Sequence, residues 1–422
     1  MRTILSITVM FAGLVSAQIP ARAENALAPE VLLPAHEKTD AYRPAAAFGK
    51  DVYLVVWQAD RIQKGDLVAC RVSASGQALD AKPFVVSNAP DDQERPRVAF
   101  GGGMFLVVWQ DLRNEKDYDT YAARISPEGR TLDDKGILIA GGEHNQSRPR
   151  VTFDGKHFYV VWEDRRSSLG YEVYGARVAP EGTILDKGGV LLAGFEKEKD
   201  KRSFDRYMPA AASSGDGRTF VVWCGTKYWV GWGTQAGSLF VKDGKVEKHN
   251  EKLEGIKDRN GSVGGGGRGG TPVSAAAGKD GYLVLWRNHR PAGRAGGGAG
   301  SNCALFVANE TGWNKGETLN LSGKPHVAMD PEAAWDGSGF IAAWTEQREV
   351  KRGYGTHEVV VAARTDSKGV SASGPLEVSG TFEAPANRVA VASDGKGSGL
   401  IAYEKHPAAA DVPIRIGFRI LK

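Results

Sequence analysis

Four carboxylates follow tryptophans at similar distances, and residues so placed could do chemistry together. Asp111, Asp164 and Glu346 each lie two residues after a tryptophan, and Asp60 lies three after one. Two carboxyl groups that flank a glycosidic bond can act as general acid and as base or nucleophile. An arginine lies just beyond each carboxylate, at Arg61, Arg113, Arg166 and Arg348. The spacing therefore allows two interpretations, a paired-carboxylate enzyme or a set of structural ion pairs.

Repetition favours the structural interpretation. A reaction centre needs one asymmetric group of residues, whereas an architectural joint recurs in every repeat. Arginine also recurs before proline, at Arg43, Arg95 and Arg148, in the same three repeats that carry the aspartates. We expect both positions on one face of the molecule, with arginine–carboxylate pairs within or between repeats. The alternative is that these three arginines form a basic inner rim for an anionic ligand.

Two of the tryptophans, Trp223 and Trp286, are not followed by a carboxylate, and here the sequence points to a ligand site. Two Gly-rich stretches, 259–270 and 290–300, lie in the same region, and long irregular loops in compact domains are often functional. Nearby aromatic faces could stack on sugar rings or bury in a partner. The alternative is a flexible excursion with solvated arginines and with tryptophans packed between repeats. The predicted ligand-binding residues are Trp229, Trp232, Arg268, Arg287, Asn288, His289, Arg290 and Arg294.

A repeated phrase predicts the elements that position these residues. Successive markers lie 52, 53, 61, 63, 58 and 59 residues apart, close to one four-stranded blade with its loops. The strands are short, rich in β-branched and aromatic residues and separated by Gly and Pro turns, most clearly over 97–100, 105–109, 121–125 and 137–140. The sequence therefore predicts an all-β, seven-bladed β-propeller of four-stranded blades. The markers, each ending an aliphatic run, are Trp57, Trp109, Trp162, Trp223, Trp286, Trp344 and, in a degenerate copy, Tyr403.

The two ends of the chain complement each other. The last copy supplies only three strands, over 388–392, 399–403 and 414–420, while residues 30–33 precede the first copy as a separate strand candidate. We expect this N-terminal strand to complete the last blade, which leaves no central strand edge unpaired.

The first residues are typical of an export signal. Arg2 precedes an apolar run over 4–15 and a small-residue ending, with cleavage after Ala23 preferred over Ala17. This predicts a signal peptide over 1–23, a single propeller domain over 24–422, and a secreted or periplasmic protein. No later segment approaches the roughly 20 apolar residues of a membrane helix.

Composition and spacing exclude several other classes. A formal charge of +4 is too small in a chain of this length to indicate a nucleic-acid binder. The eight histidines show no metal-ligand spacing, and the run over 264–267 lacks the ending of a P-loop, so no metal or cofactor is predicted. Three cysteines are too few for a disulfide scaffold; Cys224 and Cys303 either pair or, with Cys70, remain separate thiols.

One repeat carries a family resemblance. Residues 148–155, followed by 158–162 and Asp164, resemble the repeats of secreted bacterial propellers that are distantly similar to sialidase-type folds. The resemblance covers nearly the whole chain after the signal, and it implies architecture only. Sialidases usually have six blades and Asp-box turns, which residues 393–397 and the equivalent turns do not reproduce. No Tyr–Glu pair or arginine triad can be assigned, so sialidase activity is not implied.

For function, we expect a non-enzymatic binding module that recognises carbohydrate or an extracellular protein through the face bearing the loops of the fourth and fifth blades. The alternative is a polysaccharide hydrolase or lyase on the same face, with His289 or one of the four carboxylates as acid or base. A structural part of a larger envelope assembly is a third possibility. No catalytic residue is assigned.

Overall fold

The computed structural model describes most of the chain after its first 25 residues. The described residues are 26–60, 65–194, 204–227, 234–250, 273–287, 301–309, 312–315, 319–321, 327–349, 356–371, 374–379, 384–409 and 411–422. They form strands and turns, and no helix occurs among them.

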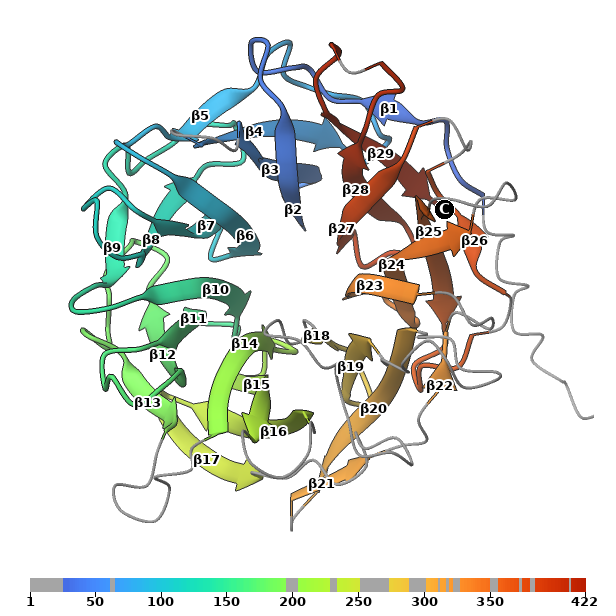
Figure 1. Cartoon of the computed structure of the whole chain (residues 1–422). Helices are drawn as coiled ribbons and strands as arrows, with labels where there is room; N and C mark the ends of the chain where they lie inside the picture. The colour runs from blue at the N-terminus through green and yellow to red at the C-terminus, as the bar shows by residue number, and fades with distance from the viewer. Residues whose placement is uncertain are drawn as a thin grey trace, which may run out of the picture.

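Seven antiparallel sheets stand side by side in a ring around a central axis (Figure 1). Each is a meander whose first strand lies innermost, so this is a seven-bladed β-propeller, as predicted. Blade 5 alone adds a fifth strand, because β21 and β22 both pair with β20. Blade 1 contains β2 (Ala41–Gly49), β3 (Val52–Ala59), β4 (Asp66–Ser73) and β5 (Phe84–Ser87); blade 2 contains β6 (Gln93–Gly101), β7 (Met104–Asp111), β8 (Asp119–Ile125) and β9 (Ile137–Ala140); and blade 3 contains β10 (Gln146–Phe153), β11 (Phe158–Asp164), β12 (Glu172–Val178) and β13 (Val190–Ala193). Blade 4 contains β14 (Phe204–Ala212), β15 (Arg218–Lys227), β16 (Thr234–Lys242) and β17 (Lys245–Asn250), and blade 5 contains β18 (Val273–Ala277), β19 (Tyr282–Arg287), β20 (Ser301–Asn309), β21 (Gly312–Lys315) and β22 (Leu319–Asn320). Blade 6 contains β23 (Val327–Trp335), β24 (Phe340–Glu349), β25 (Thr356–Thr365) and β26 (Leu376–Glu377), and blade 7 contains β27 (Ala386–Ser393), β28 (Gly399–Lys405), β29 (Arg415–Leu421) and β1 (Val31–Leu32).

The second strand of each blade carries an uninterrupted apolar run because both of its faces are covered. In β7, Phe105 and Val107 pack against blade 1, while Leu106 and Val108 pack against blade 3. Side chains of a strand alternate between its two faces, so an uninterrupted aliphatic run fits a strand between two neighbouring sheets. The same arrangement gives one hydrophobic cluster at each of the seven blade interfaces.

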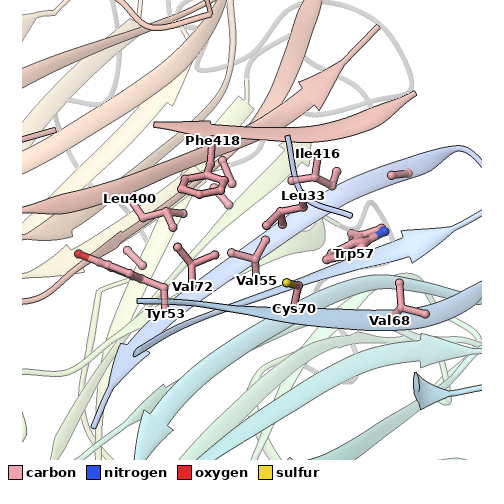
Figure 2. Close-up of a cluster of buried hydrophobic side chains, with 14 of the residues drawn as sticks. Leu33, Tyr53, Val55, Trp57, Val68, Cys70, Val72, Leu400, Ile416 and Phe418 are labelled. Atoms are coloured by element: carbon pink, nitrogen blue, oxygen red, sulfur yellow. The ribbon is translucent and has the colours of Figure 1, made fainter. Parts of the chain in front are cut away.

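The N-terminal strand closes the ring, as predicted from the missing strand of the last copy. β1 pairs antiparallel with β29, Val31 opposite Phe418, and Leu33 enters the cluster between blades 7 and 1 beside Ile416 (Figure 2). The amide of Leu33 donates to the carbonyl of Ile416 at 2.9 Å. Strands from near both ends of the chain therefore share one sheet.

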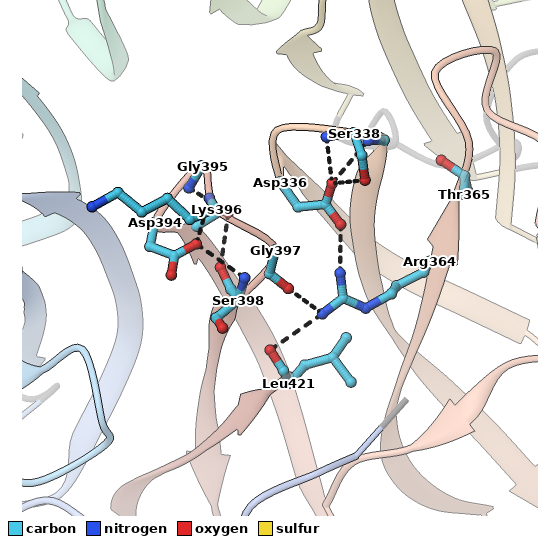
Figure 3. Close-up of polar contacts among 12 residues, drawn as sticks. Asp336, Ser338, Arg364, Thr365, Asp394, Gly395, Lys396, Gly397, Ser398 and Leu421 are labelled. Carbon is cyan, nitrogen blue, oxygen red and sulfur yellow. Dashed lines mark hydrogen bonds and ion pairs between the residues drawn. The ribbon is translucent and has the colours of Figure 1, made fainter. Parts of the chain in front are cut away.

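An ion pair within blade 6, together with a hydrogen bond from its arginine, links this blade to blade 7 on the face opposite the starts of the first strands (Figure 3). Asp336 accepts the amides of Ser338 and Gly339 at 2.9 and 2.8 Å, which fixes the turn between β23 and β24. Arg364 donates to Asp336 at 2.5 Å and to the carbonyl of Gly397 in blade 7 at 2.6 Å. The pair is nearly fully buried, so it is part of the frame.

Several predictions from the sequence concern residues that the structure does not describe. The predicted signal peptide lies outside the described residues. Among those that are described, no helix is long and apolar enough to cross a membrane. Cys224 is buried between blades 4 and 5, but the side chain of Cys303 is outside the described part, so a Cys224–Cys303 pair and separate thiols both stay as the sequence left them.

Candidate functional site

Three of the four carboxylates after the tryptophans are structural. Asp111 is fully buried, accepts the indole N–H of Trp109 at 2.7 Å, and is held by Arg113 at 2.6 Å. The Arg113 guanidinium also lies 3.9 Å from the centre of the Tyr121 ring. With its oxygens occupied and no surface exposed, this carboxylate cannot reach a substrate.

The same joint occurs in two further blades. Asp164 accepts from Trp162 at 2.8 Å and pairs with Arg166 at 2.5 Å, and Glu346 accepts from Trp344 at 3.1 Å. The structural interpretation is thus confirmed for these three groups. The expected partner was wrong, because Asp111 and Asp164 bind the arginine of their own strand end and not Arg43, Arg95 or Arg148.

Those three arginines lie at β-bulges of the innermost strands. In each described bulge the register shifts across two residues, as between Tyr42 and Ala45 in β2. The first bulge residue always has a positive φ, a conformation that side-chain-bearing residues rarely adopt. The six residues and their φ angles are Arg43 (52°), Arg95 (55°), Arg148 (49°), Met208 (52°), Asp330 (47°) and Arg388 (51°).

Three of the six bulges are held by the residue that follows the marker aromatic of the preceding blade. The amide of Arg43 donates to Glu404 at 2.7 Å, and the amide of Arg148 donates to Gln110 at 3.2 Å. Met208 donates in the same way to Glu163 at 2.5 Å. A bulge frees an amide from the ladder, and these buried side chains satisfy it. At these three positions neighbouring blades hold the strained backbone in place, which is how such strain persists at functional sites.

The bulges surround a pocket at the centre of the ring, which we call the mouth. Its bulge residues differ in charge around the ring: Arg388, Arg43, Arg95 and Arg148 belong to blades 7, 1, 2 and 3 in succession. We call these four residues the basic arc. Across the described lining, six arginines face only two carboxylates, Asp330 and Glu332. A concave site with such an excess of positive charge attracts anions.

Arg95 is the least compensated member of the basic arc. Arg43, Arg148 and Arg388 approach Glu94, Glu163 and Glu404 at 3.2, 3.6 and 3.4 Å respectively. No comparable carboxylate lies within ion-pair distance of Arg95 among the described residues. Burial, reinforced by the charges of Arg43 and Arg148, lowers the pKa of Arg95 to about 10. A group whose charge is disfavoured in this way gains from a bound anion, so Arg95 is the first candidate for ligand contact.

A second set of polar groups lies deeper in the pore, and we call it the inner layer: Arg97, Arg150, Ser274 and Glu332. Glu332 accepts from Arg150 at 2.8 Å and from the hydroxyl of Ser274 at 2.8 Å. Arg97 lies farther from Glu332, at 3.8 Å. Burial raises the pKa of Glu332, but Arg150 and Arg97 outweigh it and hold that pKa below its usual range. The carboxylate is therefore ionised.

The predicted ligand-binding residues lie outside the description. Arg287 ends β19, but its side chain is not among those described. The other seven lie outside the described residues altogether: Trp229, Trp232, Arg268, Asn288, His289, Arg290 and Arg294. The strands that lead to them end on the mouth face, since Lys227 at the end of β15 pairs with Phe204 at the start of β14. Their part in a site stays a prediction.

Sequence reasoning identified only part of the mouth. It gave Arg43, Arg95 and Arg148 as an alternative rim from their position before proline, but Arg388 precedes Val389 and escaped that pattern. Asp330 also precedes a proline, Pro331, so its position before proline is the signal in the sequence that could have identified it as a residue of the mouth.

The sequence itself matches no protein-family model and no curated protein. The solved structures similar to this one include an α-L-arabinofuranosidase of Fusarium graminearum with arabinobiose, 10% identical over 93% of this chain and 96% of that one, with a TM-score of 0.48. The polysaccharide lyase Uly1 is 11% identical over 90% and 89% of the two chains, with a TM-score of 0.49. A subtype N11 neuraminidase-like protein (H18N11) is 10% identical over 82% and 93%, with a TM-score of 0.44.

These comparisons correct one prediction. The expected non-enzymatic binding module was wrong, because the similar structures of stated activity include arabinanases, arabinofuranosidases, a family-43 glycoside hydrolase and a polysaccharide lyase. At this level of identity they say nothing about which residues act or on what.

Proposed function

We propose that the protein is a polysaccharide hydrolase or lyase that binds an acidic saccharide at the mouth. The observation that carries this proposal is the basic arc, four arginines at equivalent bulges of four adjacent blades, with Arg95 lacking an ion-pair partner among the described residues. Arginine presents a planar fork that matches a carboxylate or sulfate group. Neutral sugars alone would give such a cluster nothing to neutralise.

The mouth is asymmetric in a way that suits a substrate with one charged end. The basic arc spans blades 7 to 3, whereas blades 4 and 6 contribute Met208 and Asp330 at the equivalent bulges. An acidic group held by the arc would leave the rest of the saccharide facing this less basic side. Trp229 and Trp232, which follow β15, are proposed to stack on it there.

Asp330 is the proposed acid or base. It is a partly exposed carboxylate among the bulge residues of the mouth, in contrast to the buried Asp111 and Asp164. In a hydrolase it would transfer a proton at the glycosidic oxygen or at water. In a lyase acting on a uronate, the basic arc would neutralise the carboxylate, which makes the neighbouring C–H proton easier to remove.

The proposed saccharide substrate also bears on where the protein acts. A glycan partner outside the cytoplasm fits the predicted signal peptide over 1–23 and a domain over 24–422, and we propose a secreted or periplasmic protein on that basis. We propose no nucleic-acid partner.

The test is turnover on a panel of neutral, uronate-containing and sulfated polysaccharides. Hydrolysis releases reducing ends alone, whereas a lyase also produces an unsaturated product that absorbs in the ultraviolet. We expect turnover of acidic substrates only, with D330N lowering kcat about a hundredfold or more. We expect R95Q to raise KM tenfold or more, the equivalent of about 1.5 kcal/mol.

The matched control is R218Q. Arg218 is an exposed arginine at the start of β15, on the face away from the mouth, so its loss should leave both kinetic constants unchanged. Turnover of neutral glycans that is insensitive to R95Q would overturn the proposal, as would an inert protein on every acidic substrate.

A further inference from the structure

The inner layer, in the pore below the mouth, holds more positive than negative charge. Arg97 and Arg150 project from neighbouring first strands, and Glu332 is the one carboxylate among the described residues of this layer. Ala45, Ala210 and Ala390 occupy the corresponding positions of three other blades. Small side chains there leave room beside the charged ones, and no described side chain supplies a second negative charge.

Glu332 is committed mainly to Arg150. Its oxygens accept from Arg150 and Ser274, each at 2.8 Å, while the nearest Arg97 nitrogen is 3.8 Å away, beyond hydrogen-bond distance. Arg97 donates one bond to the carbonyl of Pro96 at 2.9 Å. Glu332 and Arg150 therefore form a hydrogen-bonded ion pair, and Arg97 lies beside this pair as a second cation.

Arg97 carries donors that the protein leaves without an acceptor. Its Nε is fully buried and has no hydrogen-bond partner among the described residues, while 29% of its side chain is exposed to the pore. Burial, with Arg150 close by, lowers the pKa of Arg97 to about 9. An arginine in a protein stays charged, so an acceptor is needed near this guanidinium rather than loss of its proton.

We propose that a small monovalent inorganic anion of the halide class binds in the inner layer against Arg97, with Arg150 and Arg95 as its other positive neighbours. One such charge balances the single excess cation of Arg97, Arg150 and Glu332. The alanines leave space for a compact ion and supply no polar group of their own. The ion completes the frame beneath the mouth.

The same chemistry could be supplied by an acidic group of a saccharide that reaches down from the mouth. The two sources are separable because a free halide binds without any glycan. The inference is independent of the proposed enzymatic activity, since it rests on Arg97 and its neighbours and needs no turnover.

Thermal unfolding of the full chain in chloride-free buffer tests the proposal, with a bulky buffer sulfonate holding ionic strength constant. Sodium chloride or bromide should raise the midpoint temperature of the wild type with the concentration dependence of a single site. R97Q should lose that dependence, and R218Q should keep it. An equal chloride response in wild type and R97Q overturns the site.

A sodium glucuronate arm separates the two sources of the anion. If glucuronate raises the midpoint through Arg97 and chloride does not, the acidic group of a saccharide is the ligand and the resident halide is wrong. If chloride acts through Arg97, with or without glucuronate, the proposal holds. Failure of all glycan turnover would leave this result untouched.

Two further measurements protect the test against a variant that does not fold. A45E places a tethered carboxylate in the blade beside Arg97, and it should raise the midpoint in chloride-free buffer and abolish the chloride response. Anomalous diffraction from wild-type crystals grown in bromide should show a peak against the Arg97 guanidinium. Bromide at other places only would contradict the proposal.

Discussion

Tyr403 donates its hydroxyl hydrogen bond to Glu30, a residue 373 positions earlier in the chain. In blades 2, 3 and 6 the marker tryptophan donates instead to a carboxylate two residues later in its own strand. Blade 7 has Lys405 at that place, and the Lys405 ammonium lies 3.3 Å from Glu30. The N-terminal segment thus supplies, across the closure of the ring, the carboxylate that other blades carry themselves.

Y403F should lower the free energy of unfolding by about 1–3 kcal/mol, because a hydrogen bond to a charged group is lost. Denaturant unfolding monitored by tryptophan fluorescence measures the loss. In an E30A background the same change should cost much less, since the acceptor is already gone. Two fully additive losses would show that the bond does not couple the ends of the chain.

D111N should destabilise the protein by about 3 kcal/mol, because it breaks a buried pair and leaves Arg113 without its carboxylate. The measurement is again the free energy of unfolding, and kcat on any substrate found should not change. D164N is the matched variant, since Asp164 makes the same contacts in blade 3. A hundredfold loss of kcat at unchanged stability would restore the paired-carboxylate interpretation.

The architecture could be predicted because the same pattern of buried residues recurs in each blade. The run over 105–109 is apolar on both faces because a blade lies on each side of it, and this leaves a mark in the sequence at every repeat. Closure by β1 followed from counting strands in the last copy. The structural role of Asp111 followed from the recurrence of a carboxylate after the marker tryptophan, although only the structure shows its bond to Arg113.

The site was harder to predict because it depends on backbone geometry set by other blades. Arg43 and Arg388 become neighbours in one arc only because each bulge adopts a positive φ, and Glu404 of blade 7 holds the bulge of blade 1. No local pattern encodes that long-range bond. Arg97 looked unremarkable in the sequence, since its charge matters only beside Arg150 and Glu332.

E163Q should change how stability depends on pH. Burial raises the pKa of Glu163, although Arg148 and the amide of Met208 oppose that rise. The folded state therefore keeps this proton to a higher pH than the unfolded state, whose value is about 4.3. Stability contributed by this group is present below that value and is lost as pH rises through the folded pKa.

Glutamine removes the titration and keeps an oxygen for Met208, as Gln110 does for the amide of Arg148 in the neighbouring blade. The difference in unfolding free energy, E163Q minus wild type, should become more positive as pH rises from about 4 to neutrality. Urea unfolding at a series of pH values measures it. Curves that stay parallel would mean that Glu163 ionises as readily in the folded as in the unfolded state.

E332Q should destabilise the protein by about 3 kcal/mol, because Arg150 and Arg97 then share a pore with no carboxylate between them. The hydroxyl of Ser274 can still donate to the glutamine oxygen, so the loss reports on charge more than on the hydrogen bond. The double variant E332Q/R150M should recover part of the stability, because an apolar chain of similar volume replaces the cation that lost its partner. Denaturant unfolding in chloride-free buffer measures both variants. If R150M instead lowers the free energy of unfolding by its own full amount in addition to the loss from E332Q, excess positive charge does not destabilise the inner layer. The role assigned to Arg97 then loses its electrostatic basis.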